Sequence, residues 1–226
     1  MMAVLLMEKN KTETITKFNR FKPEIHDRLG TAVLEIFSNS DFHKANIRDI
    51  AKRAGVSFST IYNYYGSKEG LLFAFVNIWL GELTDRITDH LQGIEDLKEK
   101  IRKVFWLQLD YYEKNVGLGK ILFMTLPMKT WMADETFQQR KMVNLFLDVL
   151  REGQDEGILN PDVRAGVLLD FVLGIVQRSF FMWISRGQKG SLTGQANVLF
   201  EMVWRAISNP GKEGVKSVGN DFFEKN

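Results

Sequence analysis

The stretch from Asn46 to Tyr65, NIRDIAKRAGVSFSTIYNYY, decides the fold of the N-terminal part of this 226-residue chain. Its first half predicts a helix over residues 47–54, because apolar side chains recur at positions i, i+3 and i+4 while charged side chains occupy the other face. Asn46 is a favourable N-cap, and Gly55 can end the helix in the left-handed conformation that most residues avoid. The sequence therefore predicts a short helix with a defined corner behind it.

The second half of the stretch predicts another short helix, capped by Ser57. Ile61 and Tyr65, four residues apart, form its inward stripe. The side chains left outside are Phe58, Ser59, Tyr62 and Asn63. Hydroxyl and amide groups on an exposed helix reach phosphates and base edges, so residues 46–65 are predicted to form a helix-turn-helix that enters a DNA major groove. The alternative is an ordinary corner between two helices of a helical protein.

The flanking sequence extends this pattern on both sides. Upstream, apolar residues from Ile25 to Phe37 recur at helical spacing and predict a helix over residues 23–40, with Pro23 in its first turn. Downstream, GSKEGLL at residues 66–72 predicts a tight turn followed by a new N-cap at Ser67.

This order of helices, with the strings IRDIAKRAGVS, TIYNYY and SKE, resembles the DNA-binding domain of the TetR family of transcriptional regulators over residues 22–79. The resemblance implies an all-α protein, in which an N-terminal three-helix DNA-binding domain precedes a C-terminal helical domain for ligand binding and dimerisation. The expected parts are a flexible arm at 1–21, the DNA-binding domain at 22–67, the ligand-binding and dimerisation domain at 68–208, and a flexible tail at 209–226.

The resemblance also implies roles for individual residues. Phosphate contacts are expected from four side chains, base-edge contacts from Arg48 and Asn63, and insertion into the groove from the front of the second helix. The expected DNA-contacting residues are Asn46, Arg48, Ser57, Phe58, Ser59, Thr60, Tyr62, Asn63, Tyr64 and Lys68, of which Asn46, Tyr62, Tyr64 and Lys68 are those expected at phosphates. Phe58 departs from the family's more common polar residue and is expected against a thymine methyl group.

Charge is distributed unevenly along the chain. Nine Lys/Arg and five Asp/Glu residues between Lys17 and Lys68 give this region a net charge of +4, which leaves −2 for the rest of a chain whose net charge is +2. A basic N-terminal part on a mildly acidic remainder suits attraction of phosphate by one end only.

The remaining sequence predicts a helical domain. Apolar spacing and caps predict helices over 68–91, from Leu97 to about 115, over 118–125, over 133–156, from an Asn160 cap through 185 with Pro161 at the first helical position, and over 193–207. The last two are apolar on more than one side, which indicates a homodimer formed through them, as in the TetR family; a thick monomeric core is the alternative.

Aromatic and Met residues gather in the middle of this domain. Such a cluster is often plain core, but the resemblance implies a cavity for a small, neutral, apolar or aromatic effector. The expected ligand-contacting residues are Trp106, Tyr112, Phe123, Met128, Trp131, Phe146, Gln177 and Phe180, with Gln108 and Asn144 as further polar contacts.

Several classes of function are disfavoured. The chain has no Cys and three separated His residues, so no metal site is expected, and no cofactor is expected either. No Gly-rich phosphate loop or nucleophile–base order suggests an enzyme, and we interpret Asp110 and Glu113 as an acidic pair on a solvated helix face.

Localisation is expected to be cytoplasmic. Residues 1–7 lack the features of a signal peptide, and charged or polar residues interrupt the apolar stretch 167–184, so no membrane association is expected. The sequence thus predicts a ligand-responsive, dimeric repressor on a palindromic operator. The alternative is a DNA-bound architectural or division-control protein that binds another protein in place of a ligand.

Overall fold

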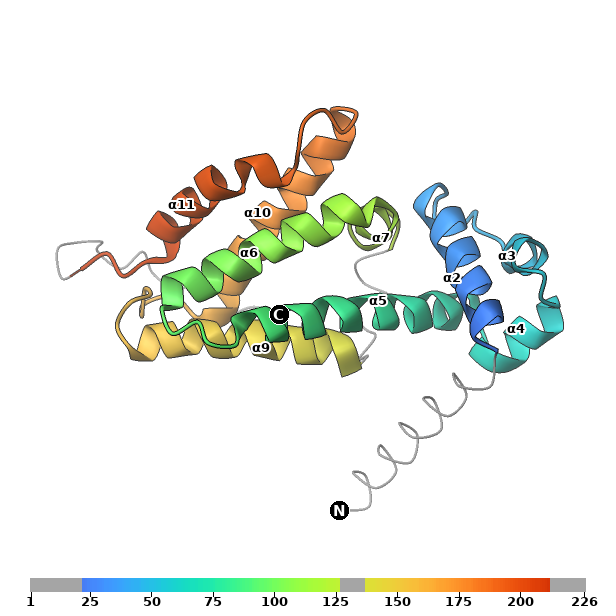
Figure 1. Ribbon diagram of the computed structural model, residues 1–226, viewed down its shortest axis with the longest axis horizontal. Coiled ribbons are helices and arrows are strands. Elements are labelled where there is room, and N and C mark those ends of the chain that lie inside the picture. The colour runs from blue at the N-terminus through green and yellow to red at the C-terminus, as the bar shows by residue number, and fades with distance from the viewer. Residues whose placement is uncertain (1–21, 127–136, 212–226) are drawn as a thin grey trace, which may run out of the picture. The chain divides into compact units, whose positions relative to one another are not determined.

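The computed structural model describes residues 22–126 and 137–211, and these residues are helical without a named strand (Figure 1). The predicted all-α class is confirmed. The described residues form two compact units, which we call the head, residues 22–79 and 117–126, and the body, residues 80–116 and 137–211. Helix α5, Lys68–Leu91, contributes its first half to the head and its second half to the body. The head therefore extends past the expected domain end at residue 67.

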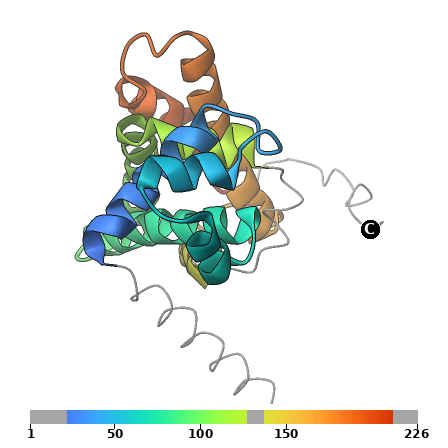
Figure 2. The same cartoon turned by 90° about the vertical axis from the view of Figure 1, so that its right-hand side faces the viewer.

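Three short helices begin the head: α2, Pro23–Ser38, α3, Ile47–Ala54, and α4, Phe58–Tyr65 (Figure 2). Their apolar stripes meet in a core in which Leu29, Val33, Phe37, Ile50 and Ile61 are fully buried. α2 ends two residues earlier than predicted, where the side-chain amide of Asn39 donates to the carbonyl of Glu35 at 2.8 Å and so caps the last turn.

The head also includes a segment from later in the chain. The single helix predicted over 118–125 is a short α-helix, α7, Val116–Lys120, followed by a π-helical turn, η1, Ile121–Thr125. The hydroxyl of Thr125 donates to the carbonyl of Phe37 at 3.0 Å, which fixes η1 against the end of α2. No pattern in the sequence predicts that these residues belong to the head.

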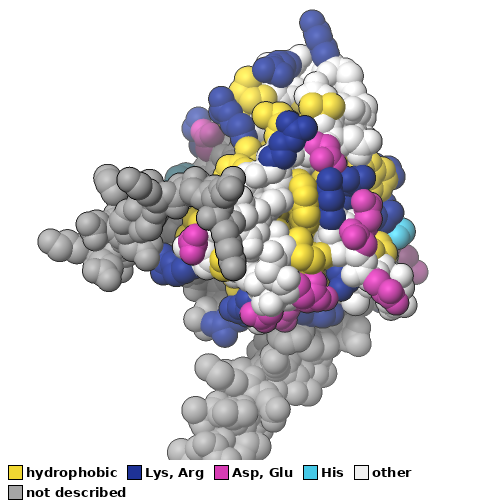
Figure 3. All heavy atoms as spheres, turned by 90° about the vertical axis from the view of Figure 1, so that its left-hand side faces the viewer, with side chains coloured by type: hydrophobic (Ala, Val, Ile, Leu, Met, Phe, Trp, Pro, Cys, Tyr) yellow, Lys and Arg dark blue, Asp and Glu magenta, His cyan; other side chains and the backbone are white. Residues whose placement is uncertain are grey.

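The body is built around α6, Leu97–Lys114, of whose 18 residues ten are buried. It packs against α9, Phe137–Asp155, α10, Ala165–Ser185, and α11, Ala196–Ile207, which the short 3-10 turn η2, Thr193–Gln195, precedes. On the face drawn in Figure 3, basic and acidic side chains are interspersed. Charges of both signs therefore lie close to one another on the part of this face that the picture shows. Ion pairs of the body include Lys98–Glu201 and Lys100–Glu152.

The predicted start of α10 at Asn160 and Pro161 is wrong, because the helix begins at Ala165. The side-chain oxygen of Asn160 accepts from the backbone N–H of Asp162 at 2.9 Å and so caps a turn, while its own N–H donates to the carbonyl of Ile207. The amide of Gln154 donates to the carbonyls of Asn160 and Val163 at 2.7 and 2.6 Å. Residues 160–163 are thus held out of helical conformation by partners remote in the sequence.

By length and composition alone, α10 is the one described helix that is apolar enough to cross a membrane, although Asp170 and Arg178 lie within it. Apolar core helices pass the same test. Several of its apolar side chains are exposed in the single chain, among them Phe171 and Phe181.

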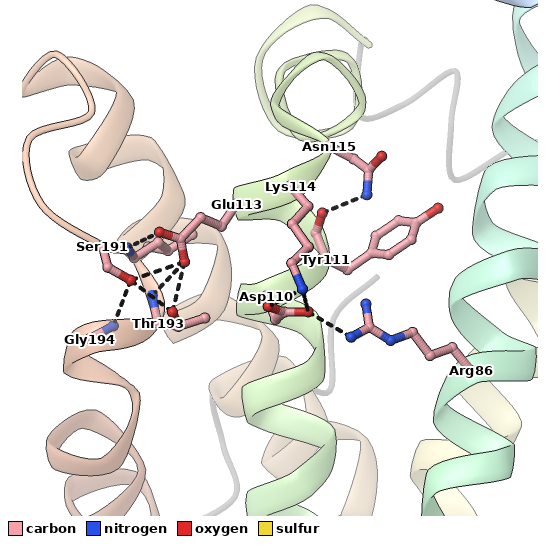
Figure 4. A network of polar contacts seen from close by, with 10 residues as sticks. Arg86, Asp110, Tyr111, Glu113, Lys114, Asn115, Ser191, Thr193 and Gly194 are labelled. Atoms are coloured by element: carbon pink, nitrogen blue, oxygen red, sulfur yellow. Dashed lines mark hydrogen bonds and ion pairs between the residues drawn. The ribbon is translucent and has the colours of Figure 1, made fainter.

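The interpretation of Asp110 and Glu113 as a solvated pair is wrong. Asp110 is only 6% exposed, and its carboxylate lies 2.7 Å from the guanidinium of Arg86 on α5 and 2.9 Å from the ammonium of Lys114 (Figure 4). Burial by itself would raise the pKa of Asp110, but hydrogen bonds from Lys114 and Arg86 outweigh it, so this pKa is lowered. The ion pair between Arg86 and Asp110 therefore joins the body half of α5 to α6.

Glu113 ties α6 to the loop before α11. Its carboxylate accepts from the backbone N–H groups of Leu192 and Thr193, both at 2.9 Å, and from the hydroxyls of Thr193 and Ser191 at 2.8 and 3.2 Å (Figure 4). Burial would raise the pKa of Glu113, but these hydrogen bonds outweigh that effect, and the pKa is lowered. The ionised carboxylate therefore acts as the cap of η2.

Replacing Glu113 by alanine should lower the free energy of unfolding by about 1–3 kcal/mol at neutral pH, because two backbone N–H groups lose a charged acceptor. A group whose folded pKa is lowered stabilises the protein above its unfolded pKa and loses that effect as pH falls through the folded value. The difference between wild type and Glu113→Ala, measured by urea unfolding, should therefore shrink below the ordinary glutamate pKa of about 4.3. Glu95→Ala, at an exposed loop position, is the control. A difference independent of pH would contradict this role.

Candidate nucleic-acid interface

The corner between α3 and α4 has the predicted geometry. Gly55 adopts φ 67° and ψ 35°, a left-handed conformation, and its N–H donates to the carbonyl of Lys52. The N–H of the next residue, Val56, donates to the carbonyl of Ala51 at 2.9 Å. These bonds satisfy the carbonyls at the end of α3 and turn the chain into α4.

Both helices of the motif carry side-chain N-caps. The side-chain oxygen of Asn46 accepts from the backbone N–H of Arg48 at 2.9 Å. The hydroxyl of Ser57 accepts from the N–H of Thr60 at 3.0 Å and lies 3.0 Å from the hydroxyl of Ser59. Asn46 and Ser57, which are both expected to contact DNA, therefore also stabilise the helices that carry the other expected DNA contacts.

The outer surface of α4 is aromatic and polar. Phe58 is 41% exposed and Tyr62 52% exposed, with 5.9 Å between their ring centroids, whereas Ile61 between them is fully buried. Ser59 and Asn63 are exposed as well, and Thr60 and Tyr64 are partly so. A buried anchor thus holds α4 while its other side faces solvent.

The structure brings Arg48 of α3 onto this surface, with its guanidinium carbon 5.5 Å from the centroid of the Phe58 ring. Arg48, Phe58, Asn46 and Lys68 line one open groove on the head, together with residues of the loop before α3. Four of the residues that the sequence analysis expected at DNA therefore line the same groove of the head.

Lys68 has a role that sequence reasoning missed. Its ammonium donates to the carbonyl of Phe42 at 2.7 Å and lies 3.3 Å from that of Ala45 and 3.4 Å from that of His43. It also lies 4.6 Å from the centroid of the Phe42 ring. The side chain at the start of α5 thus closes the loop before α3, a contact between residues more than 20 positions apart for which the sequence has no signal.

The body has a small cavity of about 30 Å³ between α6, α9 and α10. Of the residues expected at a ligand, Phe146 lines it, and so does Gln108. Tyr112 and Phe180 pack edge to face in the body core, with centroids 6.1 Å apart, and burial raises the pKa of the Tyr112 phenol.

The other expected ligand residues that the structure describes do not belong to the lining of this cavity. Trp106 is partly exposed, with the Lys103 ammonium 5.4 Å from its ring centroid, and Gln177 is partly buried on α10. Asn144 is exposed on α9, and Phe123 belongs to the head. Met128 and Trp131 lie outside the described residues. Within the described part of the chain there is no group of three or more His, Cys, Asp or Glu residues that could hold a metal ion.

Comparison with known proteins agrees with this geometry. The family model for bacterial regulatory proteins of the tetR family matches residues 31–75, which include α3, the corner and α4. The fatty acid metabolism regulator protein of Bacillus subtilis is 21% identical over 180 residues, 79% of this chain and 93% of that protein. The transcriptional repressor KstR2 of Mycobacterium tuberculosis is 24% identical over 164 residues, 68% of this chain and 80% of the repressor.

Solved structures share the fold over most of the chain. FadR, a fatty acid degradation regulator from Bacillus halodurans, has a TM-score of 0.71 at 20% identity and covers 82% of this chain and 96% of its own. FadR from Bacillus subtilis, in complex with stearoyl-CoA, has a TM-score of 0.68 at 19% identity and covers 80% of this chain and 99% of its own. The relatives are named as transcriptional regulators, not as enzymes. With its capped helix-turn-helix over the matched residues and its helical body, this chain is similar to the TetR family of bacterial transcriptional regulators.

Proposed function

We propose that this protein is a dimeric repressor that binds a palindromic operator and is released from it by a small apolar or aromatic effector. The observation that carries the proposal is the surface of α4, on which Phe58, Tyr62 and Asn63 face solvent around the buried Ile61. Aromatic and amide groups on the outside of a firmly anchored helix have no use in packing the head. They suit the edges and methyl groups of bases in a major groove.

Roles within the interface are proposed on the basis of the geometry and the family resemblance. Arg48 and Asn63 are proposed to read base edges, because guanidinium and amide groups can bond guanine and adenine in bidentate fashion. Phe58, beside Arg48, is proposed to lie against a thymine methyl group. The proposed phosphate contacts are Asn46, Tyr62, Tyr64 and Lys68, with Ser57, Ser59 and Thr60 at the front of α4 in the groove. Asn46 uses its side-chain oxygen as a cap, so the amide nitrogen is the donor for a phosphate.

A symmetric dimer is proposed to form through α10 and α11. Val167, Phe171 and Phe181 are at least 36% exposed and share one face of α10 with Gly174, at which an added Cβ would meet no atom within 4 Å. On α11, Val198 and Met202 are 68% and 62% exposed, four residues apart. Such apolar surface suits a second copy of the chain, and a two-fold pair of heads would read two half-sites.

The effector is proposed to act by linkage. The body cavity is lined by α6, and α6 is joined to α5 by the Asp110–Arg86 pair. A ligand that binds better to a shifted α6 would also shift α5. Binding of the ligand would then lower the affinity for DNA by the same factor by which bound DNA lowers the affinity for the ligand, typically ~5–150-fold. Relatives named for fatty acid and ketosteroid regulation, one of them solved with stearoyl-CoA, support an apolar effector. We place the protein in the cytoplasm with its DNA.

The cavity's volume of about 30 Å³ favours a second candidate, because no drug-sized molecule fits it without movement of the walls. In that case the same head would serve an architectural or division-control protein whose body binds another protein. A compound that releases the protein from its operator would exclude this candidate.

Asn63→Ala should weaken binding to the operator by about 1–3 kcal/mol and relax sequence choice, because a bidentate base contact is lost. The operator is first obtained by selecting bound sequences from random duplex DNA. Affinities are then measured on the selected and a scrambled duplex at one salt concentration. Asn39→Ala, at an exposed asparagine of the head outside α3 and α4, is the matched control. Equal losses on both duplexes would refute base reading by Asn63.

Lys68→Ala should weaken binding to the selected and the scrambled duplex about equally, because the proposed phosphate contact carries no sequence information. It should also lower the slope of log affinity against log salt by about 1. It should also lower the melting temperature, since the carbonyls of Phe42, His43 and Ala45 lose their donor. Lys189→Ala, at an exposed site in the body, controls for net charge. A lower melting temperature with an unchanged salt slope would assign Lys68 a purely structural role.

The double change Val198→Glu and Met202→Glu should convert the dimer into monomers and weaken binding to the palindrome, because carboxylates would have to be buried between the subunits. Sedimentation analysis and duplex titration measure both effects. Ile158→Glu is the control, since Ile158 is 37% exposed in the loop after α9. A double variant that still sediments as a dimer would show that α11 is not at the interface.

A further inference from the structure

Gln108 is a buried polar residue whose amide nitrogen has no hydrogen-bond partner. It lies in the middle of α6, is 3% exposed, and lines the body cavity. The other described residues that line the cavity are apolar, and they come from all three surrounding helices, α6, α9 and α10. Gln108 is therefore the one polar residue among the described residues of the lining, and its amide nitrogen is buried, so that the accessible surface of the cavity is apolar.

The folding of the body does not explain this amide. A buried N–H without an acceptor is rare in folded proteins, because it loses its hydration and gains nothing in return. A methionine or leucine would fill the same space without that cost. A trapped water is a poor partner here, since a buried water needs two to four polar neighbours and the described lining offers one.

Neighbouring polar groups of the body do find partners inside the protein. Asp110 and Glu113, on the same helix, are paired with Arg86 and with the loop before α11. The amide of Gln154 donates to two carbonyls. Arg102 leaves its Nε unpaired, but its guanidinium bonds to Glu201 and lies outside the cavity lining. Gln108 is thus distinguished by both its missing partner and its position.

We propose that the Gln108 amide donates a hydrogen bond to an uncharged carbonyl oxygen of the effector, whose remaining buried atoms are apolar. This inference rests on the proposed effector function and names the chemical class that the site selects: ketones, esters or thioesters. A buried carboxylate is excluded, because no Lys, Arg or His belongs to the described lining and the charge would be left without a partner. A charged part of the ligand has to lie outside this cavity.

Occupation of the cavity requires its walls to move. About 30 Å³ holds one or two waters, so an effector must displace side chains such as Phe146 and Leu150 of α9. Its carbonyl would bind α6 at Gln108, two residues before Asp110, which is bonded to Arg86 of α5. The proposed contact is therefore placed where it can shift the helix that continues into the head.

The test compares decan-2-one with decane on the full-length protein, by calorimetry or by the shift in thermal unfolding. The measured quantity is the ratio of the ketone's affinity to the alkane's, so that the probes' own hydration cancels between variants. Gln108→Met should lower this ratio roughly 5–150-fold, the equivalent of a buried donor and acceptor left unpaired. Gln92→Met, at an exposed glutamine of the body outside the described cavity lining, is the matched control and should leave the ratio unchanged.

A second readout needs no ligand. Gln108→Met should raise the thermal unfolding temperature of the free protein, because it removes an unsatisfied donor from the core. The proposal would be overturned by a lowered unfolding temperature, an unchanged affinity ratio or an equal effect of Gln92→Met. It would also be overturned if decanoate bound as tightly as the ketone, or if the ketone did not bind the wild-type protein. Duplex binding without probe is measured in parallel. If the protein does not bind duplex DNA but shows normal selectivity for the ketone, the proposed regulator function is refuted while the proposed Gln108 contact is retained.

Discussion

The burial of α6 between α9, α10 and α11 is the constraint from which the architecture of the body follows. Where the helix is covered, its polar residues are removed from water, so each buried one needs a partner within the protein. Asp110 and Glu113 meet this need with Arg86 and the loop before α11, and in doing so fix α5 and α11 relative to α6. Gln108 does not meet it within the protein.

The local features of the fold could be predicted from the sequence. The bounds of α3 and α4, the left-handed Gly55 and the caps at Asn46 and Ser57 depend on residues within a few positions of each other, so their signals are contiguous in the chain. The exposed face of α4 was predicted for the same reason, since burial of Ile61 dictates which side chains point away from it.

Features that depend on remote partners could not be predicted. Pro161 and Asn160 are ordinary helix-starting residues, but Gln154 and the end of α11 hold them in a turn. The spacing of Asp110 and Glu113 is typical of an exposed face, and only the packing of α6 reveals otherwise. Likewise, nothing near Lys68 indicates that its ammonium is occupied by carbonyls of the loop before α3. Among the aromatic residues expected at a ligand that the structure describes, Phe146 alone lines the cavity. Amino-acid composition does not distinguish a residue that lines a cavity from one that packs in the core.

In the helix-turn-helix, the side chains that we propose to read DNA differ from those that hold the two helices together. Phe58, Tyr62 and Asn63 are exposed, while Ile50 and Ile61 hold the two helices together. Substitutions on the outer face of α4 therefore leave the head intact, and a lineage can drift toward a new target sequence through a series of folded intermediates. Asn46 and Ser57 are the exceptions, since each is both cap and surface. These two positions should vary least among descendants that have changed their operators.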